Sequence, residues 1–278
     1  MARVRVAVVG HCEVVEFARV DHVPAAGEIV KTTETWVEPA GGGAVAAVQL
    51  ARLAGTCLFL TALGDDELGR RARERLEALG VRVAAARRPP PQRRGVVFVD
   101  ADGERTITVI GERHGPDGDD PLPWDELAGA DAVYFTAGDA AALKASRRAR
   151  TLVATVRAGE TLARAAVELD ALVASARDPG ERYEDGDLEP PPRLVVRTEG
   201  AAGGSLSSRA GGGARWRAAP LPGPPADSYG AGDSFAAGLA YGLGEGREPA
   251  AALALAARCG AACATGDGPY EAQLRSPS

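Results

Sequence analysis

The 278-residue sequence predicts an α/β fold, a doubly wound, mostly parallel sheet with helices on both faces. From about residue 125 onward, short apolar segments alternate with longer segments of helical character. The apolar segments lack the polar alternation of strands that have one face in solvent, so we expect them to be buried parallel strands. The composition, with 45% hydrophobic and 25% charged residues, is ordinary for a globular protein.

The N-terminal half begins with a buried strand and then changes character. Val4–Val9 is apolar except for Arg5 and ends at Gly10, as a parallel strand would. Residues 11–38 alternate more regularly and contain Pro24 and Gly27, which predicts antiparallel strands joined by a turn. The remaining elements expected here are a helix at Ala44–Leu53 that ends at Gly55, a strand at Cys57–Ala62, a helix at Asp66–Leu79, and a hairpin formed by Gly95–Asp100 and Arg105–Ile110.

The C-terminal half repeats strand and helix, which is the pattern of a parallel sheet with crossover helices. The predicted strands are Ala132–Phe135, Leu152–Val156, Ala171–Ala174 and Leu194–Thr198, followed by a hairpin over residues 205–217. The predicted helices are Ala140–Arg150, Glu160–Glu168, Ser234–Leu243 and Pro249–Ala264. Two segments rich in Asp, Gly and Pro, Gly111–Pro123 and Asp178–Pro192, carry no pattern of regular structure.

The charge balance excludes some classes of partner. The net charge is −6, whereas nucleic acids and anionic membranes attract basic surfaces, so we expect neither as a partner. No apolar stretch is long enough to span a bilayer, and the first residues show no cleavage pattern, so we expect a cytoplasmic protein. The four cysteines are scattered and are expected to be buried free thiols (Cys12, Cys57, Cys259, Cys263).

The most informative segment is Asp227–Gly238, which places a small-residue loop in front of an Ala-rich helix. Gly230 and Gly232 allow a tight turn and leave no side chain to block an anion. The first amides of the following helix have no intrahelical partner, and the helix dipole there favours negative charge. Asp233 sits at the mouth of this turn, where a carboxylate can take a proton from a substrate hydroxyl.

The whole string Asp227-Ser228-Tyr229-Gly230-Ala231-Gly232-Asp233, continuing to Gly238, resembles the C-terminal signature of the PfkB/ribokinase family of carbohydrate kinases. The resemblance implies a ribokinase-like domain over residues 1–278, with a small β-sheet lid from about 11–38 and 95–110. It also implies ATP-dependent phosphorylation of a hydroxyl on a sugar or sugar-like molecule. Asp233 would be the base, and the amides of Gly230, Ala231 and Gly232 would stabilise the transferring phosphoryl group.

The same resemblance implies further binding residues. Thr198, Gly200 and Gly203 match the family's nucleotide loop beside the ATP phosphates, and Thr265 and Gly268 fall where the family wraps the adenine. For Mg²⁺ the family commonly carries Asn-x-x-Glu after a strand, whereas this chain has Ser175 and Asp178, which can still offer oxygen ligands. A monovalent cation near the anion turn is possible, and because the lid often forms a dimer interface in the family, we expect a homodimer.

The acceptor site departs most from the family pattern. Gly41, Gly42 and Gly43 match a Gly-Gly turn that lets the backbone touch sugar hydroxyls. Two usual sugar ligands, an Asn and an Asp, are replaced by Val45 and Val15. Glu13 is then either a substitute ligand or an exposed strand carboxylate. Arg105 in the lid and Arg157 after a strand are either anion ligands or surface arginines.

Two alternative functions stay open at this point. A nucleoside kinase on the same fold would use the apolar valines and the lid aromatics Phe17, Trp36 and Phe98 against a base. A non-catalytic ligand sensor would have kept the nucleotide site and lost the sugar contacts. The complete anion turn with Asp233 favours an enzyme, because a sensor needs no base.

Overall fold

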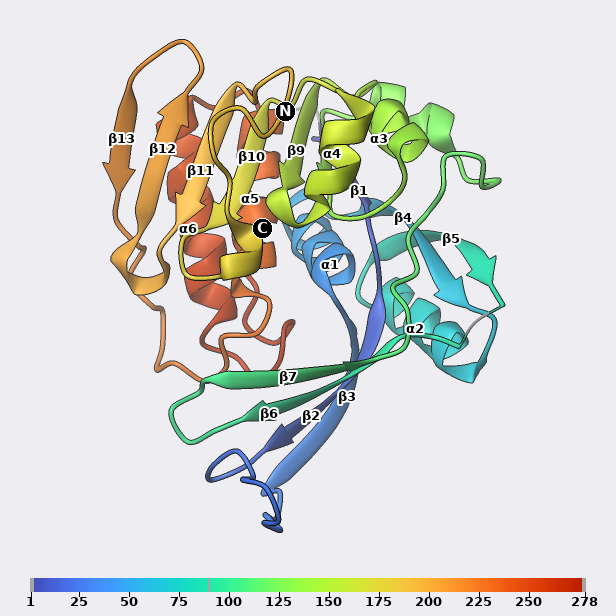
Figure 1. Ribbon diagram of the computed structural model, residues 1–278, viewed down its shortest axis with the longest axis vertical. Helices are drawn as coiled ribbons and strands as arrows, with labels where there is room; N and C mark the ends of the chain where they lie inside the picture. The colour runs from blue at the N-terminus through green and yellow to red at the C-terminus, as the bar shows by residue number, and fades with distance from the viewer. Residues whose placement is uncertain (1–2, 90, 277–278) are drawn as a thin grey trace.

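The computed structural model describes residues 3–89 and 91–276, which form one large and one small β-sheet (Figure 1). The large sheet has nine strands in the order β13-β12-β11-β10-β9-β8-β1-β4-β5. Its strands are β1 Val6–Val9, β4 Cys57–Gly64, β5 Val81–Arg88, β8 Ala132–Phe135, β9 Thr151–Thr155, β10 Ala171–Ser175, β11 Leu194–Thr198, β12 Gly204–Ser208 and β13 Gly213–Trp216. All neighbours pair in parallel except β11–β12 and β12–β13. The predicted doubly wound, mostly parallel sheet is therefore confirmed.

Helices cover both faces of the large sheet (Figure 1). One face packs against α1 Gly42–Ala54, α2 Glu67–Ala78, α5 Ala231–Gly244 and α6 Pro249–Cys263. The other packs against α3 Ala140–Ser146, α4 Gly159–Ala165 and the 3-10 turn η1 Trp124–Gly129. In β1 the side chains of Val6 and Val8 join the first layer and those of Ala7 and Val9 join the second, as the alternation of a strand requires.

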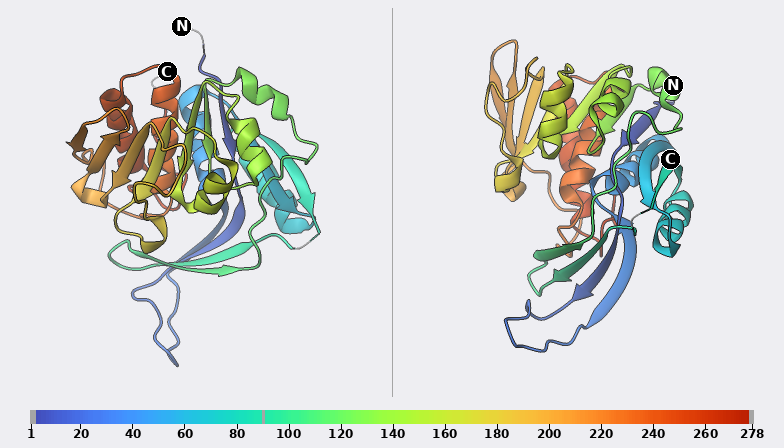
Figure 2. Two further views of the ribbon diagram at one scale, coloured as in Figure 1. Left: turned by 45° about the horizontal axis from the view of Figure 1, so that its top comes forward. Right: turned by 45° about the vertical axis from the view of Figure 1, so that its right-hand side comes forward.

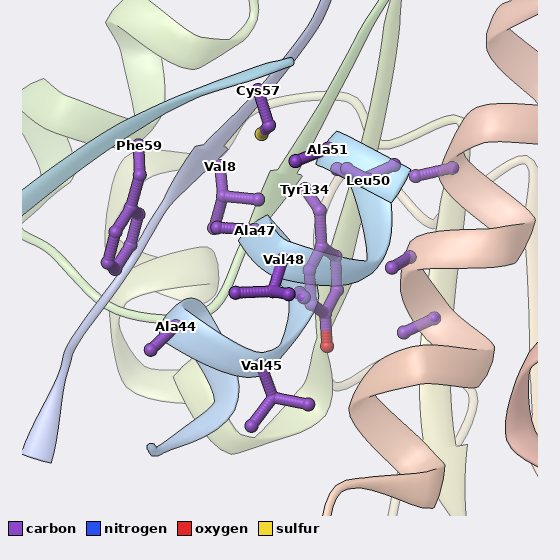
Figure 3. Close-up of a cluster of buried hydrophobic side chains, with 14 of the residues drawn as sticks. Val8, Ala44, Val45, Ala47, Val48, Leu50, Ala51, Cys57, Phe59 and Tyr134 are labelled. Atoms are coloured by element: carbon purple, nitrogen blue, oxygen red, sulfur yellow. The ribbon is translucent and has the colours of Figure 1, made fainter. Parts of the chain in front are cut away.

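The core around α1 fixes where this helix begins. Figure 3 shows Val48 on α1 close to Val8 and Tyr134 of the sheet. These three side chains are at most 2% exposed and belong to one hydrophobic cluster. Because this helix is clamped between the sheet and α5, its first residues are held at the carboxyl end of β1.

The small sheet has four strands in the order β3-β2-β6-β7 and projects below the large one (Figure 2). The strands are β2 Glu13–Arg19, β3 Glu34–Ala40, β6 Arg94–Val99 and β7 Arg105–Ile110, which come from the segments predicted for the lid. Phe17 stacks on Trp36 at a centroid distance of 5.2 Å and meets Tyr229 edge-on at 5.1 Å. The small sheet therefore packs directly against the loop that leads into α5.

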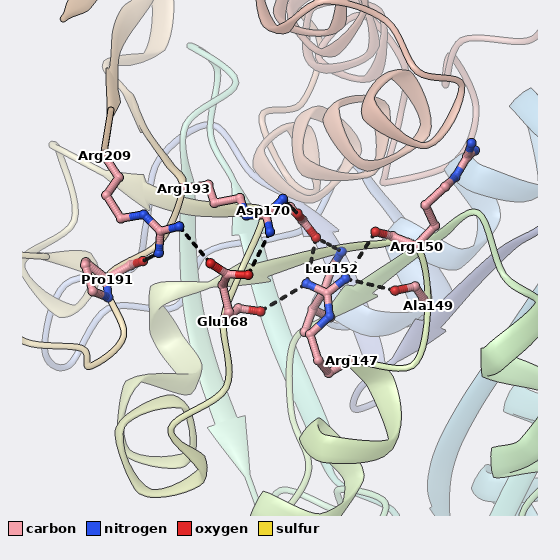
Figure 4. A network of polar contacts seen from close by, with 9 residues as sticks. All are labelled: Arg147, Ala149, Arg150, Leu152, Glu168, Asp170, Pro191, Arg193 and Arg209. Carbon is pink, nitrogen blue, oxygen red and sulfur yellow. Dashed lines mark hydrogen bonds and ion pairs between the residues drawn. The ribbon is translucent and has the colours of Figure 1, made fainter. Parts of the chain in front are cut away.

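Two local expectations were incomplete or wrong. The strand β5 was not predicted; it lies at the edge of the sheet, pairs within the described part of the chain only with β4, and has an irregular burial pattern. The helix predicted to reach Arg150 ends at Ser146, and the one predicted to reach Glu168 ends at Ala165. Arg147 explains both ends, because its guanidinium donates to the main-chain oxygens of Ala149, Arg150 and Glu168 and so stabilises non-helical backbone there (Figure 4).

Two further predictions concern the state of the cysteines and the presence of membrane-spanning segments. The four cysteines are buried and free, as predicted. Within residues 3–89 and 91–276, no helix is both long and apolar enough to cross a bilayer.

Candidate active site

The predicted catalytic turn lies at the carboxyl edge of the large sheet, where ligands bind in open α/β folds. His11 follows β1, Arg157 follows β9 and Asp178 follows β10, while α5 points its first turn towards the same edge. A cavity of about 410 Å³ exists at the opposite edge, among the amino ends of β9, β10 and β11. The arginines that line that cavity are already paired with Glu168, so we attribute a structural role to that network (Figure 4).

The anion turn has the geometry that its sequence predicts. Gly230 has φ 79°, and a β-carbon there would lie 2.9 Å from Val45 Cγ1, so only glycine fits. A β-carbon on Gly232 would meet nothing within 4 Å, which leaves open space in front of the turn. In the described part of the chain, the N–H groups of Gly232 and Asp233 have no hydrogen-bond acceptor. The turn therefore offers free donors at the positive end of α5.

Asp233 projects from the first turn of α5 towards the start of α1. A β-carbon on Gly42 would lie 2.8 Å from Asp233 Oδ1, so the carboxylate rests directly against this glycine. The pKa of Asp233 is raised to about 7, chiefly because burial disfavours the charged form and next because Glu181 repels it, while Arg157 and Arg105 oppose the rise. A carboxyl group with this pKa is suited to accept a proton near neutral pH.

Glu13 is not an exposed strand carboxylate, and that interpretation was wrong. Only 7% of Glu13 is exposed, because it lies at the start of β2 between the small sheet and the anion turn. Arg93 Nε lies 3.0 Å from Glu13 Oε2, and the Tyr229 hydroxyl donates to Glu13 Oε1 at 3.4 Å. The same hydroxyl accepts from the Gly41 amide at 3.3 Å. Glu13 is thus fixed beside the glycine turn that was predicted to contact the acceptor.

His11 is a site residue that sequence analysis missed. A β-carbon on Gly41 would lie 3.0 Å from the His11 ring, and one on Gly42 would lie 3.8 Å from His11 Cε1. Burial and the positive charges of Arg113, Arg93 and Arg157 lower the pKa of His11 to about 3, so the ring is neutral. Its Nδ1 is buried without a hydrogen-bond partner among the described residues. The available signal was position alone, because His11 directly follows the glycine that ends the first strand.

The two predicted arginines are held differently. Arg157 forms ion pairs with Asp178 and with Glu181, which ends the 3-10 turn η3 Pro179–Glu181. Arg105 on β7 reaches across to the anion turn, where its Nη1 lies 2.7 Å from Ser228 Oγ. Glu181 was not predicted as a site residue, because it lies in a segment without any periodic pattern.

The predicted metal ligands are partly engaged within the protein. Asp178 accepts from the Gly180 amide at 2.8 Å with one oxygen and binds Arg157 with the other. Ser175 Oγ accepts from the Arg177 amide at 3.3 Å. No group of three or more His, Cys, Asp and Glu side chains in the described ranges is arranged to hold a metal ion.

The two predicted nucleotide segments lie in different surroundings. Thr198 ends β11 and leads into a turn where Gly200 has φ 63° and Gly203 has φ 89°, at the carboxyl edge of the sheet. Gly268 instead donates to Asp227 Oδ2 at 3.2 Å, and a β-carbon there would lie 2.7 Å from Trp36 Nε1 of the small sheet. Thr265 donates to the carbonyl of Ala262 at the end of α6.

The chain is similar to known carbohydrate kinases. The model of the pfkB family carbohydrate kinases matches residues 4–179 and 168–275. A fructokinase from Klebsiella pneumoniae is 30% identical over 284 aligned residues, which cover 85% of this chain and 91% of that protein. A ribokinase structure from Thermotoga maritima superposes with a TM-score of 0.77 at 21% identity, covering 98% of this chain and 96% of that one.

A structure of Arabidopsis thaliana ribokinase with ribose and ATP superposes with a TM-score of 0.76 at 21% identity, over 99% of this chain and 96% of that one. At this identity, the two superpositions establish the fold, and the family match establishes the class of reaction. The chain belongs to the pfkB family of carbohydrate kinases, ATP-dependent phosphotransferases with an alcohol group as acceptor.

Proposed function

We propose that this kinase binds a sugar-like acceptor between the Gly41–Gly43 turn and Asp233, and that Asp233 removes the proton of the attacking hydroxyl. The observation that carries the proposal is the contact of Asp233 with Gly42, together with the raised pKa of that carboxyl group. The amides of Gly230 and Gly232 then stabilise negative charge on the transferring phosphoryl group, whereas the predicted Ala231 amide donates to the Ser228 oxygen at 3.4 Å and must leave this weak bond to take part. Positioning and electrostatics supply the acceleration, as is general in phosphoryl transfer.

Two carboxylates that pair with Arg157 fit a role towards Mg²⁺. Asp178 and Glu181 both lie on Arg157, and Glu181 is the charge that most strongly raises the pKa of Asp233. Mg²⁺ keeps several waters and is held largely by substrate phosphates, so a few carboxylates suffice. When bound, the ion would neutralise charge on the ATP phosphates. Ser175 is the weaker candidate, because its hydroxyl already caps a local turn.

Different residues support the nucleotide site and the site for a monovalent cation. Thr198, Gly200 and Gly203 form a small-residue turn at the carboxyl edge, which suits close approach of ATP phosphates. Asp227 is 1% exposed, and its only hydrogen-bond donors among the described residues are the amides of Tyr229 and Gly268. Among the described residues no basic side chain forms an ion pair with Asp227, although Arg105 and Arg19 oppose the rise that burial causes in its pKa, so this carboxylate fits a monovalent cation beside the anion turn.

The aromatic residues of the small sheet favour a sugar over a nucleoside. Phe17 and Trp36 stack on each other with an interplanar angle of 2°, and Phe17 also packs on Tyr229. Each ring therefore has one face covered by the other, and the Arg19 guanidinium lies 5.8 Å from the centroid of the Trp36 ring, so this pair offers little ring surface to a base. Phe98, the third aromatic residue predicted to contact a base, is half-buried.

The proposal is tested by measuring ADP release with Mg²⁺ and ATP across pentoses, hexoses, sugar acids, sugar phosphates and nucleosides. We expect acceptor-dependent release with at least one sugar-like compound. Acceptor-dependent release with nucleosides alone would instead identify a nucleoside kinase. ATP binding without acceptor-dependent release from any compound would favour a ligand sensor.

The pH profile of kcat/KM should report the Asp233 carboxyl. Because the base acts in its ionised form and its pKa is raised to about 7, kcat/KM should fall tenfold per pH unit well below pH 7. In Glu181→Gln the negative charge that raises this pKa is removed, so the fall should move to lower pH. The readout is the pH at which kcat/KM falls, and it does not depend on the maximum value that kcat/KM reaches. Glu160→Gln, an exposed carboxylate, is the control, and an unmoved profile in Glu181→Gln would contradict the assignment.

We further propose that two copies pair through the edge of the small sheet. All six residues of β7 are exposed, including Ile107, Val109 and Ile110, and among the residues that the structure describes β7 pairs only with β6. An apolar edge strand of this kind is a template for pairing with another strand. Val109→Lys should convert a dimer into a monomer in sedimentation experiments, whereas Leu221→Lys, at a similarly exposed apolar residue elsewhere, should not. A monomeric wild-type protein at about 50 μM, a concentration typical for weak dimers, would contradict the proposal.

A further inference from the structure

A pair of arginines lies at the base of the small sheet, next to the acceptor site. Arg93 precedes β6, and its main-chain oxygen accepts from the Val14 amide at 2.9 Å, one residue beyond Glu13. Arg113 follows β7, and the segment around it runs alongside Arg93. A β-carbon on Gly111 would lie 3.8 Å from Arg93 Cα, and His114 Nε2 lies 2.9 Å from the oxygen of Pro91.

The guanidinium groups of this pair have more donors than the protein satisfies. The Arg93 side chain is 14% exposed, and its Nε is 3.0 Å from Glu13 Oε2 but too poorly aligned for a hydrogen bond. Among the described residues, Arg113 makes no ion pair and no side-chain hydrogen bond, and neither terminal nitrogen of Arg93 has an acceptor. Arg113 is exposed, so water satisfies its donors until a ligand binds, whereas unpaired donors on the largely buried Arg93 side chain are costly unless a ligand supplies the acceptors.

The positive charges of Arg93 and Arg113 also repel each other. Burial lowers the pKa of Arg113, repulsion by Arg93 and Arg157 lowers it further, and the Glu13 carboxylate alone opposes the shift. Such a concentration of positive charge is notable in a chain whose net charge is −6. A second anion at this place would relieve the repulsion that one carboxylate leaves uncompensated.

His11 connects this pair with the catalytic carboxylate. Its ring flanks Gly42 on one side, and Asp233 Oδ1 meets the same glycine. The buried Nδ1 has no partner within the described ranges, so it is free to hydrogen-bond a ligand. A molecule with a hydroxyl at Asp233 would therefore pass His11 and reach Arg93 and Arg113 with its other end.

We propose that the acceptor carries an oxyanion, a carboxylate or a phosphate, and that Arg113 and Arg93 bind it while a hydroxyl of the same molecule faces Asp233. This inference rests on the proposed function, because it names the acceptor class of that site. The planar fork of guanidinium donors matches both kinds of oxyanion. Sugar acids and sugar phosphates are the two sources of this chemistry.

The test compares matched acceptors that differ only in charge: a neutral sugar, its aldonic acid and its monophosphate. For wild type, kcat/KM should be at least about 10-fold higher for one anionic member than for the neutral sugar, and which member it is distinguishes carboxylate from phosphate. Arg113→Gln should raise KM for that member by about 10- to 100-fold, with kcat and the KM for ATP little changed. Arg93→Gln should do the same. Arg71→Gln, at an exposed residue that pairs with Glu67, is the matched control.

A binding measurement separates this proposal from the proposed function. Calorimetry with Asp233→Asn, which lacks the base, should detect the anionic acceptor, and its affinity should fall in Asp233→Asn/Arg113→Gln. Arg113-dependent binding without any phosphoryl transfer by wild type would support the oxyanion site and refute the proposed role of Asp233. Equal use of the neutral sugar, equal losses for neutral and anionic acceptors in Arg113→Gln, or no binding of either anion at 10 mM, roughly a hundred times an ordinary KM, would overturn the inference.

Discussion

Asp233→Asn is expected to lower kcat by about a thousandfold while leaving the affinity for ATP unchanged. Asn keeps the size of the side chain but cannot accept the hydroxyl proton. The backbone amides of Gly230–Gly232, which we assign to the phosphoryl group, are unaffected. Steady-state kinetics with the best acceptor, together with ATP titration by calorimetry, checks both parts. A kcat within about tenfold of wild type would remove Asp233 from the role of general base.

The same substitution should stabilise the protein at alkaline pH. The folded pKa of Asp233, about 7, lies above the value near 4 of an unfolded chain, so the folded state holds this proton more tightly. Wild type should therefore lose stability as pH rises from about 4 to 7, and the Asn variant should not lose this contribution. A difference of about three pKa units corresponds to about 4 kcal/mol, so at pH 8 the variant should melt roughly 8 to 16 °C higher, with no gain at pH 4. Asp119→Asn, at an exposed aspartate, is the control.

Gly42→Ala is expected to lower kcat by about a hundredfold in a protein that still folds. The added β-carbon would lie 2.8 Å from Asp233 Oδ1 and 3.5 Å from its Cγ, so the carboxylate must turn away from the acceptor. Folding should survive because the displaced atoms are the end of a side chain, and Gly42 opens a helix in which Ala is favoured. Kinetics and thermal melting of the purified variant give the two readouts.

Gly159→Ala provides a matched control for this substitution. Gly159 is likewise the first residue of a helix, α4, but a β-carbon there would meet nothing within 4 Å. It should leave kcat unchanged. If Gly42→Ala behaves like Gly159→Ala, the close contact with Asp233 has no catalytic consequence.

Much of the fold could be predicted from the sequence, because buried parallel strands are continuous apolar runs and helix ends carry glycine. The anion turn could also be predicted, because its conformation requires glycine. Gly230 has a positive φ, and Val45 leaves no room for a side chain there. Where two helices ended early, the cause was a tertiary contact, the Arg147 guanidinium, which local patterns do not contain. The edge strand β5 was missed because one-sided pairing leaves no regular burial pattern.

The acceptor site was less predictable because it is assembled from distant segments. The role of Glu13 depends on its burial beside Tyr229, which lies 216 residues away in the chain. His11 and Arg113 are single polar residues with no motif around them, and only the folding of the small sheet onto the large one brings them together. Glu181 belongs to an irregular segment whose position is fixed by its ion pair with Arg157.

The most direct test of the central claim is to follow the transferred phosphorus by ³¹P NMR with ATP, Mg²⁺ and the acceptor panel, for wild type and Asp233→Asn. We expect a phosphate monoester of one acceptor to accumulate in step with ADP in wild type and to be nearly absent in the variant. Release of inorganic phosphate alone, or equal monoester formation by both proteins, would contradict it.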